Sequence, residues 1–224
     1  MYYDQTLLML IPTMLLTLFA QIKVKSTFAK YSKVPSARRI TGKDAAALLL
    51  RVNQINNVGV EAVRGSLTDH YDPSSRKLRL SQPVFDQTSI AAIGVAAHEA
   101  GHAIQHARAW GPLGLRSGLV PVANIGSRFG PWVVIGGIFA GVPLLIHIGI
   151  ILFSVAVLFY LVTLPVEFNA SSRAIAILRE NNVLNNEELK GVKKVLTAAA
   201  LTYVASALTA LMSLFRLLLI SRRR

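Results

Sequence analysis

The sequence GVAAHEAGHAIQHA, residues 94–107, places three of the chain's five histidines and one of its eleven acidic residues in a run of small apolar side chains. The polar residues that can cap a helix here are Asp86, Thr88 and Ser89. We expect the helix to end near Trp110, before a Gly-Pro pair. A buried imidazole or carboxylate costs several kcal/mol unless it is paired or binds a metal ion. The polar side chains of this helix therefore need a partner.

HEAGH, residues 98–102, has the form H-E-x-x-H. Histidines four positions apart lie on one face of a helix, about one turn apart, so His98 and His102 can bind one zinc ion together. Glu99 lies beside that face, where it can take a proton from a water molecule that the metal activates. The alternatives are an ordinary pair of buried histidines, because three fixed residues also arise by chance, and a metal other than zinc. The surrounding alanines favour zinc, since unpaired charge is costly on so apolar a helix.

A catalytic zinc ion usually has three protein ligands and one open position. His106 continues the spacing of four, but eight residues of helix rise about 12 Å, so we interpret it as a residue that supports a ligand or as an ordinary polar side chain. Glu167 is the predicted third ligand, because it lies in a run of small and apolar residues where an unpaired carboxylate would be costly. The alternatives for Glu167 are a helix cap after Pro165 and an ion pair with Arg173. The other acidic residues after the motif lie in a polar stretch typical of a solvated turn and helix start: Glu180, Glu187 and Glu188.

The composition limits both the ligands and the class of protein. The chain has no cysteine, so any metal site must use nitrogen and oxygen. Apolar residues make up 53% of the sequence, which favours a membrane protein. The formal net charge is +13, but the basic residues cluster beside apolar segments instead of forming one basic domain. We therefore expect them to orient the chain in a lipid bilayer, and we expect no nucleic-acid partner.

Apolar and polar segments alternate along the chain in five parts. We expect a first transmembrane helix at 1–22, a cytoplasmic unit with the HEAGH helix at 23–115, a transmembrane hairpin at 116–166, a cytoplasmic segment with the third ligand at 167–194, and a last transmembrane helix with a basic tail at 195–224. The expected interfacial anchors of the first helix are Tyr2 and Tyr3, and Asp4 should lie outside. The predicted fold class is mainly α, an integral membrane protein of about four spans with a small α+β unit.

The expected hairpin determines which side of the membrane Glu167 occupies. Two crossings, with a turn near residues 143–149, place it on the same side as the histidine pair. The first crossing is the weaker one, because Arg128 must lie in protein, near the interface or beside water. Four spans also place Arg222, Arg223 and Arg224 outside, against the charge bias, so either the last helix does not fully cross or the basic residues at 23–39 outweigh the tail.

Two local patterns occur in the segment before the motif. Thr41 and Asp44 resemble a capping box, and the helix that follows should stop at Asn56, Asn57 and Gly59. GVEAVRGSLTDHYDPSSRKLRLS, residues 59–81, favours a β-hairpin with DPSS as its turn and with Leu78 and Leu80 alternating with basic residues.

HEAGHAIQHA, LVTLPVEFNASSRA and LTDHYDPSSRKLRLS together resemble the YugP-type membrane zinc metallopeptidases of bacteria, which are related in plan to the HtpX and CAAX-processing membrane proteases. The resemblance covers nearly the whole chain, with three matching segments in order. It implies a gluzincin arrangement in a metallopeptidase unit, with His98, His102 and Glu167 as zinc ligands and Glu99 as base. It also implies a bacterial inner membrane location.

The chain differs from the HtpX-like relatives at one position, and the resemblance also suggests where a substrate binds. HtpX-like relatives carry an acid four residues after the ligand glutamate, whereas this chain has Ser171, and Asn169 or Arg173 could take over part of that acid's role. By the same resemblance, the hairpin around 66–81 would be the edge strand against which an extended substrate lies. The alternative is a purely structural hairpin, and His70 could contact the substrate or be an ordinary turn residue.

The sequence thus predicts a membrane-embedded zinc endopeptidase that hydrolyses peptide bonds of membrane-associated or misfolded proteins. The alternative is a non-proteolytic scaffold or chaperone, in which zinc only holds the helix to the third span. A structural zinc site would be closed by a fourth protein ligand, His106 or an aspartate, whereas a catalytic site keeps water there. The peptide or protein substrate and the lipid bilayer are the expected partners, and partner proteins and a homo-oligomer remain open.

Overall fold

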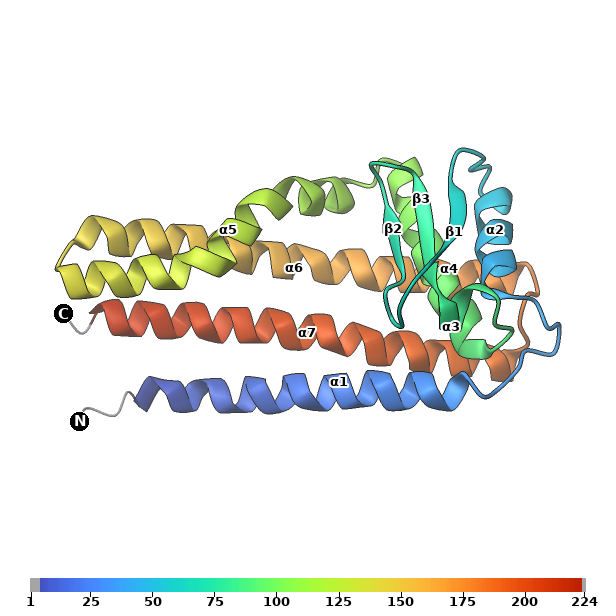
Figure 1. The fold of residues 1–224 in the computed structure, drawn as a ribbon, viewed down its shortest axis with the longest axis horizontal. Helices are drawn as coiled ribbons and strands as arrows, with labels where there is room; N and C mark the ends of the chain where they lie inside the picture. The colour runs from blue at the N-terminus through green and yellow to red at the C-terminus, as the bar shows by residue number, and fades with distance from the viewer. Residues whose placement is uncertain (1–4, 223–224) are drawn as a thin grey trace. The chain divides into compact units, whose positions relative to one another are not determined.

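The computed structural model describes residues 5–222 and confirms a mainly α-helical chain with one small sheet (Figure 1). The helices are η1 (Gln5–Leu10), α1 (Ile11–Tyr31), α2 (Gly42–Val52), α3 (Gln82–Phe85), α4 (Ile90–Ala107), α5 (Gly111–Ala140), α6 (Pro143–Glu180) and α7 (Asn186–Arg222). The strands are β1 (Gly59–Val63), β2 (His70–Asp72) and β3 (Lys77–Ser81). The predicted anchors and tail residues that lie outside the described residues are Tyr2, Tyr3, Asp4, Arg223 and Arg224.

The chain divides into two compact units. The apolar unit comprises Met1–Gln21, Gly114–Pro165 and Leu201–Arg224. The motif unit comprises Ile22–Leu113 and Val166–Ala200, and it contains the sheet and the HEAGH helix.

Three helices of the described chain are long and apolar enough to cross a membrane: Thr6–Tyr31, Pro143–Glu180 and Asn186–Arg222. α5 is not among them, because Asn124, Arg128 and several glycines lower its hydropathy. The fourth crossing therefore stays a prediction.

α5 and α6 form a close helical hairpin within the apolar unit. α5 ends at Ala140, Gly141 has a φ of +66°, and Pro143 begins α6, so the turn lies just before the expected range. Glycine adopts this left-handed conformation without strain, and proline is well placed in the first turn of a helix because its missing N–H would have no partner there. The two backbones approach closely, since a Cβ on Gly149 would lie 2.8 Å from the carbonyl oxygen of Gly130.

Two helices that flank the predicted boundaries are longer than expected. α1 continues past residue 22 to Tyr31, because its lysines are good helix formers and no proline or glycine interrupts them. α6 continues through Pro165 to Glu180, although proline removes one backbone hydrogen bond. No helix starts after Pro165, so the alternative of Glu167 as a helix cap is wrong.

The ends of α4 and α7 also differ from the predicted ones. α4 stops at Ala107, and the Gly111-Pro112 pair that was expected to end it lies in the first turn of α5 instead. α7 begins at Asn186 rather than near 195, because Asn185 and Glu188 cap it reciprocally. Glu188 also accepts a hydrogen bond of 2.6 Å from the Ala37 N–H, so it is buried and structural rather than solvated.

The HEAGH helix lies at the centre of the motif unit. Apolar side chains of α2, α3, β3, α4, α6 and α7 form one core around it. The predicted capping box of α2 is present, with the side chains of Thr41 and Asp44 each accepting from the other's backbone N–H, although α2 ends at Val52, before the expected stop. Ser89, one of the three expected caps, accepts a hydrogen bond from the Ala92 N–H and starts α4.

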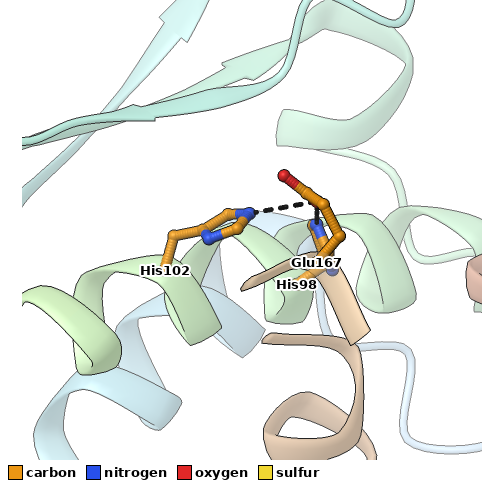
Figure 2. A group of neighbouring side chains, drawn as sticks. All are labelled: His98, His102 and Glu167. Atoms are coloured by element: carbon orange, nitrogen blue, oxygen red, sulfur yellow. Dashed lines mark hydrogen bonds and ion pairs between the residues drawn. The ribbon is translucent and has the colours of Figure 1, made fainter. Parts of the chain in front are cut away.

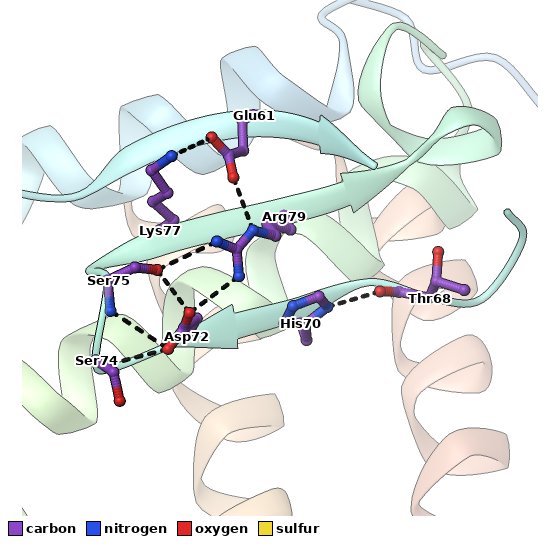
Figure 3. Close-up of polar contacts among 8 residues, drawn as sticks. All are labelled: Glu61, Thr68, His70, Asp72, Ser74, Ser75, Lys77 and Arg79. Atoms are coloured by element: carbon purple, nitrogen blue, oxygen red, sulfur yellow. Dashed lines mark hydrogen bonds and ion pairs between the residues drawn. The ribbon is translucent and has the colours of Figure 1, made fainter. Parts of the chain in front are cut away.

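The sheet has the strand order β1-β3-β2. β2 and β3 form the predicted antiparallel hairpin, but β1 pairs with β3 in parallel on the other side, which the sequence did not predict. Leu78 and Leu80 are fully buried, whereas the intervening Arg79 pairs with Glu61 and Asp72 on the opposite face (Figure 3). The alternation along β3 therefore gives one apolar and one charged face.

Candidate metal centre

A close contact between α4 and α6 brings His98 and His102 near Glu167. A Cβ on Gly101 would lie 2.6 Å from the carbonyl oxygen of Ala170, so only glycine fits at this crossing. Ala97, Ala100 and Ala174 are fully buried beside it. Small side chains on both helices thus allow the short distance that the site requires.

His98 and His102 of α4 point toward the carboxylate of Glu167 on α6 (Figure 2). Oε2 of Glu167 lies 3.1 Å from Nε2 of His98 and 3.4 Å from Nε2 of His102. The Glu167 side chain is only 3% exposed. In residues 5–222, these three side chains form the one group of histidine and acidic residues close enough to share a metal ion, with ligand atoms within 4.8 Å of one another.

The group fits zinc in its donor atoms and spacing. Two imidazole nitrogens and one carboxylate oxygen form the ligand set of many catalytic zinc sites. Ligand atoms about 2.0–2.2 Å from one zinc ion lie roughly 3.3–3.5 Å apart in a tetrahedron, close to the distances of 3.1 and 3.4 Å between Glu167 and the two histidines. The group would supply three protein donors to a tetrahedral zinc ion.

The electrostatics of the group also favour a cation. Burial lowers the pKa of His102, but the hydrogen bond with Glu167 and the negative charges of Glu99 and Glu167 outweigh it, so this pKa lies above its ordinary value. The two carboxylates, Glu99 and Glu167, bring negative charge to this group, which a divalent ion can neutralise.

Glu99 follows His98 directly and is 8% exposed. Among residues 5–222, its carboxylate has no hydrogen bond or ion pair. A carboxylate in this position, beside the two histidines and Glu167, has the chemistry to accept a proton from a nearby water molecule.

The second ring nitrogen of each histidine also has a partner. Nδ1 of His98 lies 3.0 Å from the Ser171 hydroxyl, so the residue that replaces the acid of the HtpX-like relatives does contact one of the two histidines. Nδ1 of His102 lies 3.0 Å from Oε1 of Gln105, which the sequence reasoning missed. The spacing of three from His102 on a buried helix is the clue that could have found it, because an amide there needs a partner as much as an imidazole does.

Asn169 and Arg173 lie behind Gln105. Arg173 donates from Nε to Oδ1 of Asn169 at 2.7 Å, and Gln105 donates from Nε2 to the same oxygen at 3.0 Å. The structure therefore brings Asn169 and Arg173 together near His102, whereas the predicted supporting role concerned the position of Ser171, which contacts His98.

His106 and His70 lie apart from the group of three. His106 is exposed, and its Nδ1 lies 2.8 Å from the hydroxyl of Tyr71 on β2. Burial raises the pKa of that hydroxyl. His70, also on β2, is exposed with Nδ1 2.8 Å from the Thr68 carbonyl oxygen (Figure 3). The contact between Tyr71 and His106 places β2 along the turn of α4 that follows His102.

Long apolar helices together with an H-E-x-x-H helix and a distant glutamate are the features of membrane-associated zinc metallopeptidases. A family model described as "Putative neutral zinc metallopeptidase" matches residues 6–222, and the chain belongs to this family. The chain is 53% identical over 205 residues to the "Putative membrane protease YugP" of Bacillus subtilis (strain 168). The matched region covers 92% of this chain and 91% of that protein. No solved structure matches the chain. The resemblance drawn from the three sequence segments is confirmed.

Proposed function

We propose that the chain is a membrane-embedded zinc endopeptidase, with His98, His102 and Glu167 as ligands and Glu99 as the general base. The observation that carries this proposal is the meeting of three ligand-type side chains around one point, next to a buried carboxylate that makes no hydrogen bond or ion pair within residues 5–222. Membership of a zinc metallopeptidase family supports the identity of the metal.

The reaction is hydrolysis of a peptide bond. Zinc, when bound, supplies a Lewis acid that polarises a carbonyl group and lowers the pKa of water toward neutrality. Glu99 accepts the proton of the attacking water and delivers it to the nitrogen of the leaving amine. Glu167 contributes the negative charge that holds the metal, while Ser171 and Gln105 keep the two imidazoles oriented.

The substrate in this proposal is an extended peptide segment that pairs with the free edge of β2. β2 bonds only β3 within the described sheet, and the contact between Tyr71 and His106 holds it beside the HEAGH helix. Pairing with a strand edge forms hydrogen bonds to main-chain groups and therefore depends little on side chains. It suits extended segments of varied sequence, such as those of membrane-associated or misfolded proteins.

The proposed location is the bacterial inner membrane, with four spans and the site facing the cytoplasm. The basic residues that follow the first apolar run support this orientation. A scaffold with a structural zinc site would need a fourth protein ligand, and the group within the described residues supplies three.

The test is the substitution Glu99→Gln in the full chain purified in detergent. We expect zinc content to stay at the parent level, because Glu99 is not a ligand, and cleavage to fall by about 10²–10⁴-fold. The assay is a proteome-derived peptide library whose new termini are identified by mass spectrometry. A variant that cleaves as fast as the parent would contradict the mechanism.

A further inference from the structure

We propose that Gln105 is a positioning residue that holds His102 in the tautomer required for metal binding, and that Arg173 fixes the orientation of Gln105 through Asn169. The inference rests on the proposed function, because it assigns His102 as a ligand. It follows from which atoms of these four side chains are able to donate and which are able to accept.

Arg173 provides the fixed end of the chain of hydrogen bonds. A guanidinium has only donors, so the atom of Asn169 that faces its Nε at 2.7 Å must be the oxygen Oδ1. The orientation of an asparagine amide is otherwise ambiguous, and here the arginine determines it.

Gln105 takes its orientation from Asn169 and from the backbone. Its Nε2 lies 3.0 Å from Oδ1 of Asn169 and 2.9 Å from the carbonyl oxygen of Val166. Both neighbours are acceptors, so the donating NH₂ group must face them. The amide oxygen Oε1 is then left facing His102, and the fully buried side chain of Gln105 makes a flipped arrangement costly.

The orientation of Gln105 determines the tautomer of His102. Oε1 only accepts, so Nδ1 of His102, 3.0 Å away, must carry the proton. A neutral imidazole protonated on Nδ1 has its lone pair on Nε2. Nε2 of His102 lies 3.4 Å from Oε2 of Glu167 and is the histidine atom that a shared metal ion would bind.

His98 lacks such a constraint from its own partner. The Ser171 hydroxyl near Nδ1 of His98 can donate or accept, so it accommodates either tautomer. The two ligand histidines therefore differ in how firmly the surrounding protein selects their protonation.

The first experiment compares Gln105→Leu with the parent in the full detergent-purified chain. Zinc affinity is measured by competition with a chelator, and the proton on Nδ1 of His102 in the zinc-bound protein is read from ¹⁵N-histidine NMR, with His102→Asn to assign its signals. We expect a loss of zinc affinity of about 10–100-fold and loss of the Nδ1–H tautomer as the single form. Gln87→Leu, the same change at an exposed site, is the control and should alter neither.

A second pair of variants keeps the test valid if Gln105→Leu does not fold. Asn169→Asp retains an oxygen that accepts from both Gln105 and Arg173, so it should keep zinc affinity within a few-fold of the parent. Asn169→Leu removes that acceptor and should weaken zinc binding about tenfold or more. If residue 169 only fills space, Asn169→Asp and Asn169→Leu should bind zinc equally well, so a difference between them shows that the acceptor oxygen matters.

Two results would overturn the inference while leaving the proposed function intact. One is a zinc-binding, active parent whose affinity and tautomer do not change in Gln105→Leu. The other is an Asn169→Asp variant as weak as Asn169→Leu. A parent chain that binds no zinc would instead overturn the proposed function, and this inference with it.

Discussion

The two histidines of the HEAGH helix contact the same carboxylate but differ in what lies behind them. His98 meets a single serine hydroxyl, whereas His102 meets a buried amide in a chain of hydrogen bonds that ends at a guanidinium. The helical spacing alone gives no reason for His98 and His102 to differ as possible metal ligands. The difference lies in the supporting residues: Ser171 of α6 contacts His98, whereas Gln105 of α4 contacts His102 and is itself bonded to Asn169 of α6.

The largest expected effect is on the residue that both histidines share. Glu167→Gln replaces the charged carboxylate with a neutral amide, which is a much weaker metal ligand. We expect zinc affinity to fall by more than about 100-fold, beyond the loss usual for a residue that only supports a ligand. Chelator competition measures this change, and an affinity close to that of the parent would show that Glu167 is not a ligand.

The next prediction compares the two supporting residues directly. Ser171→Ala should weaken zinc binding by less than about tenfold, less than Gln105→Leu, because a hydroxyl that can donate or accept imposes no tautomer on His98. Ser171→Asp, which restores the acid of the HtpX-like relatives, should bind zinc at least as tightly as the parent. A larger loss in Ser171→Ala than in Gln105→Leu would reverse the comparison.

Gly101→Ala should affect both histidines together. The added Cβ would lie 2.6 Å from the Ala170 carbonyl oxygen, so α4 and α6 must separate. We expect about 1–3 kcal/mol of lost stability, measured by denaturant titration, together with weaker zinc binding. Gly114→Ala is the matched control, since a Cβ at Gly114 has nothing within 4 Å and alanine favours a helix. Equal stability of the two variants would mean that the helix contact does not hold the site together.

The smallest effect is expected on the charged face of the sheet. The Ser75 hydroxyl and the Arg79 guanidinium hold the pKa of Asp72 well below its ordinary range. A carboxylate with a lowered pKa stabilises the fold at neutral pH, and this contribution is lost as the pH falls through its folded-state pKa. Asp72→Asn should therefore lower Tm slightly at pH 7, and the difference from the parent should shrink only in strongly acidic solution. A difference that vanishes already near pH 5 would contradict the lowered pKa.

The sequence predicted the parts of the site that depend on local spacing and on the cost of buried charge. The helical pair His98 and His102 follows from periodicity, and Glu167 follows from the expense of an unpaired carboxylate among apolar residues. The capping box at Thr41 and the hairpin between β2 and β3 were likewise predicted, because their signals lie within a few residues of each other.

The features that were missed depend on contacts between distant segments. Gln105 meets Asn169 only because α4 and α6 cross at Gly101, and the sequence does not show this crossing. The parallel pairing of β1 with β3 involves no tight turn between the two strands, so no local sequence signal predicts it. The continuation of α6 through Pro165 opposes the local rule that proline ends a helix, and Thr163 and Val166 on either side of it are buried. Tertiary contacts decided each of these features.

The central claim is tested most directly by zinc-edge anomalous scattering from crystals of the full chain grown with zinc. The account predicts one zinc ion bound by Nε2 of His98, Nε2 of His102 and a carboxylate oxygen of Glu167, with no fourth protein ligand. No zinc peak at these residues, or a site closed by a fourth side chain, would contradict it.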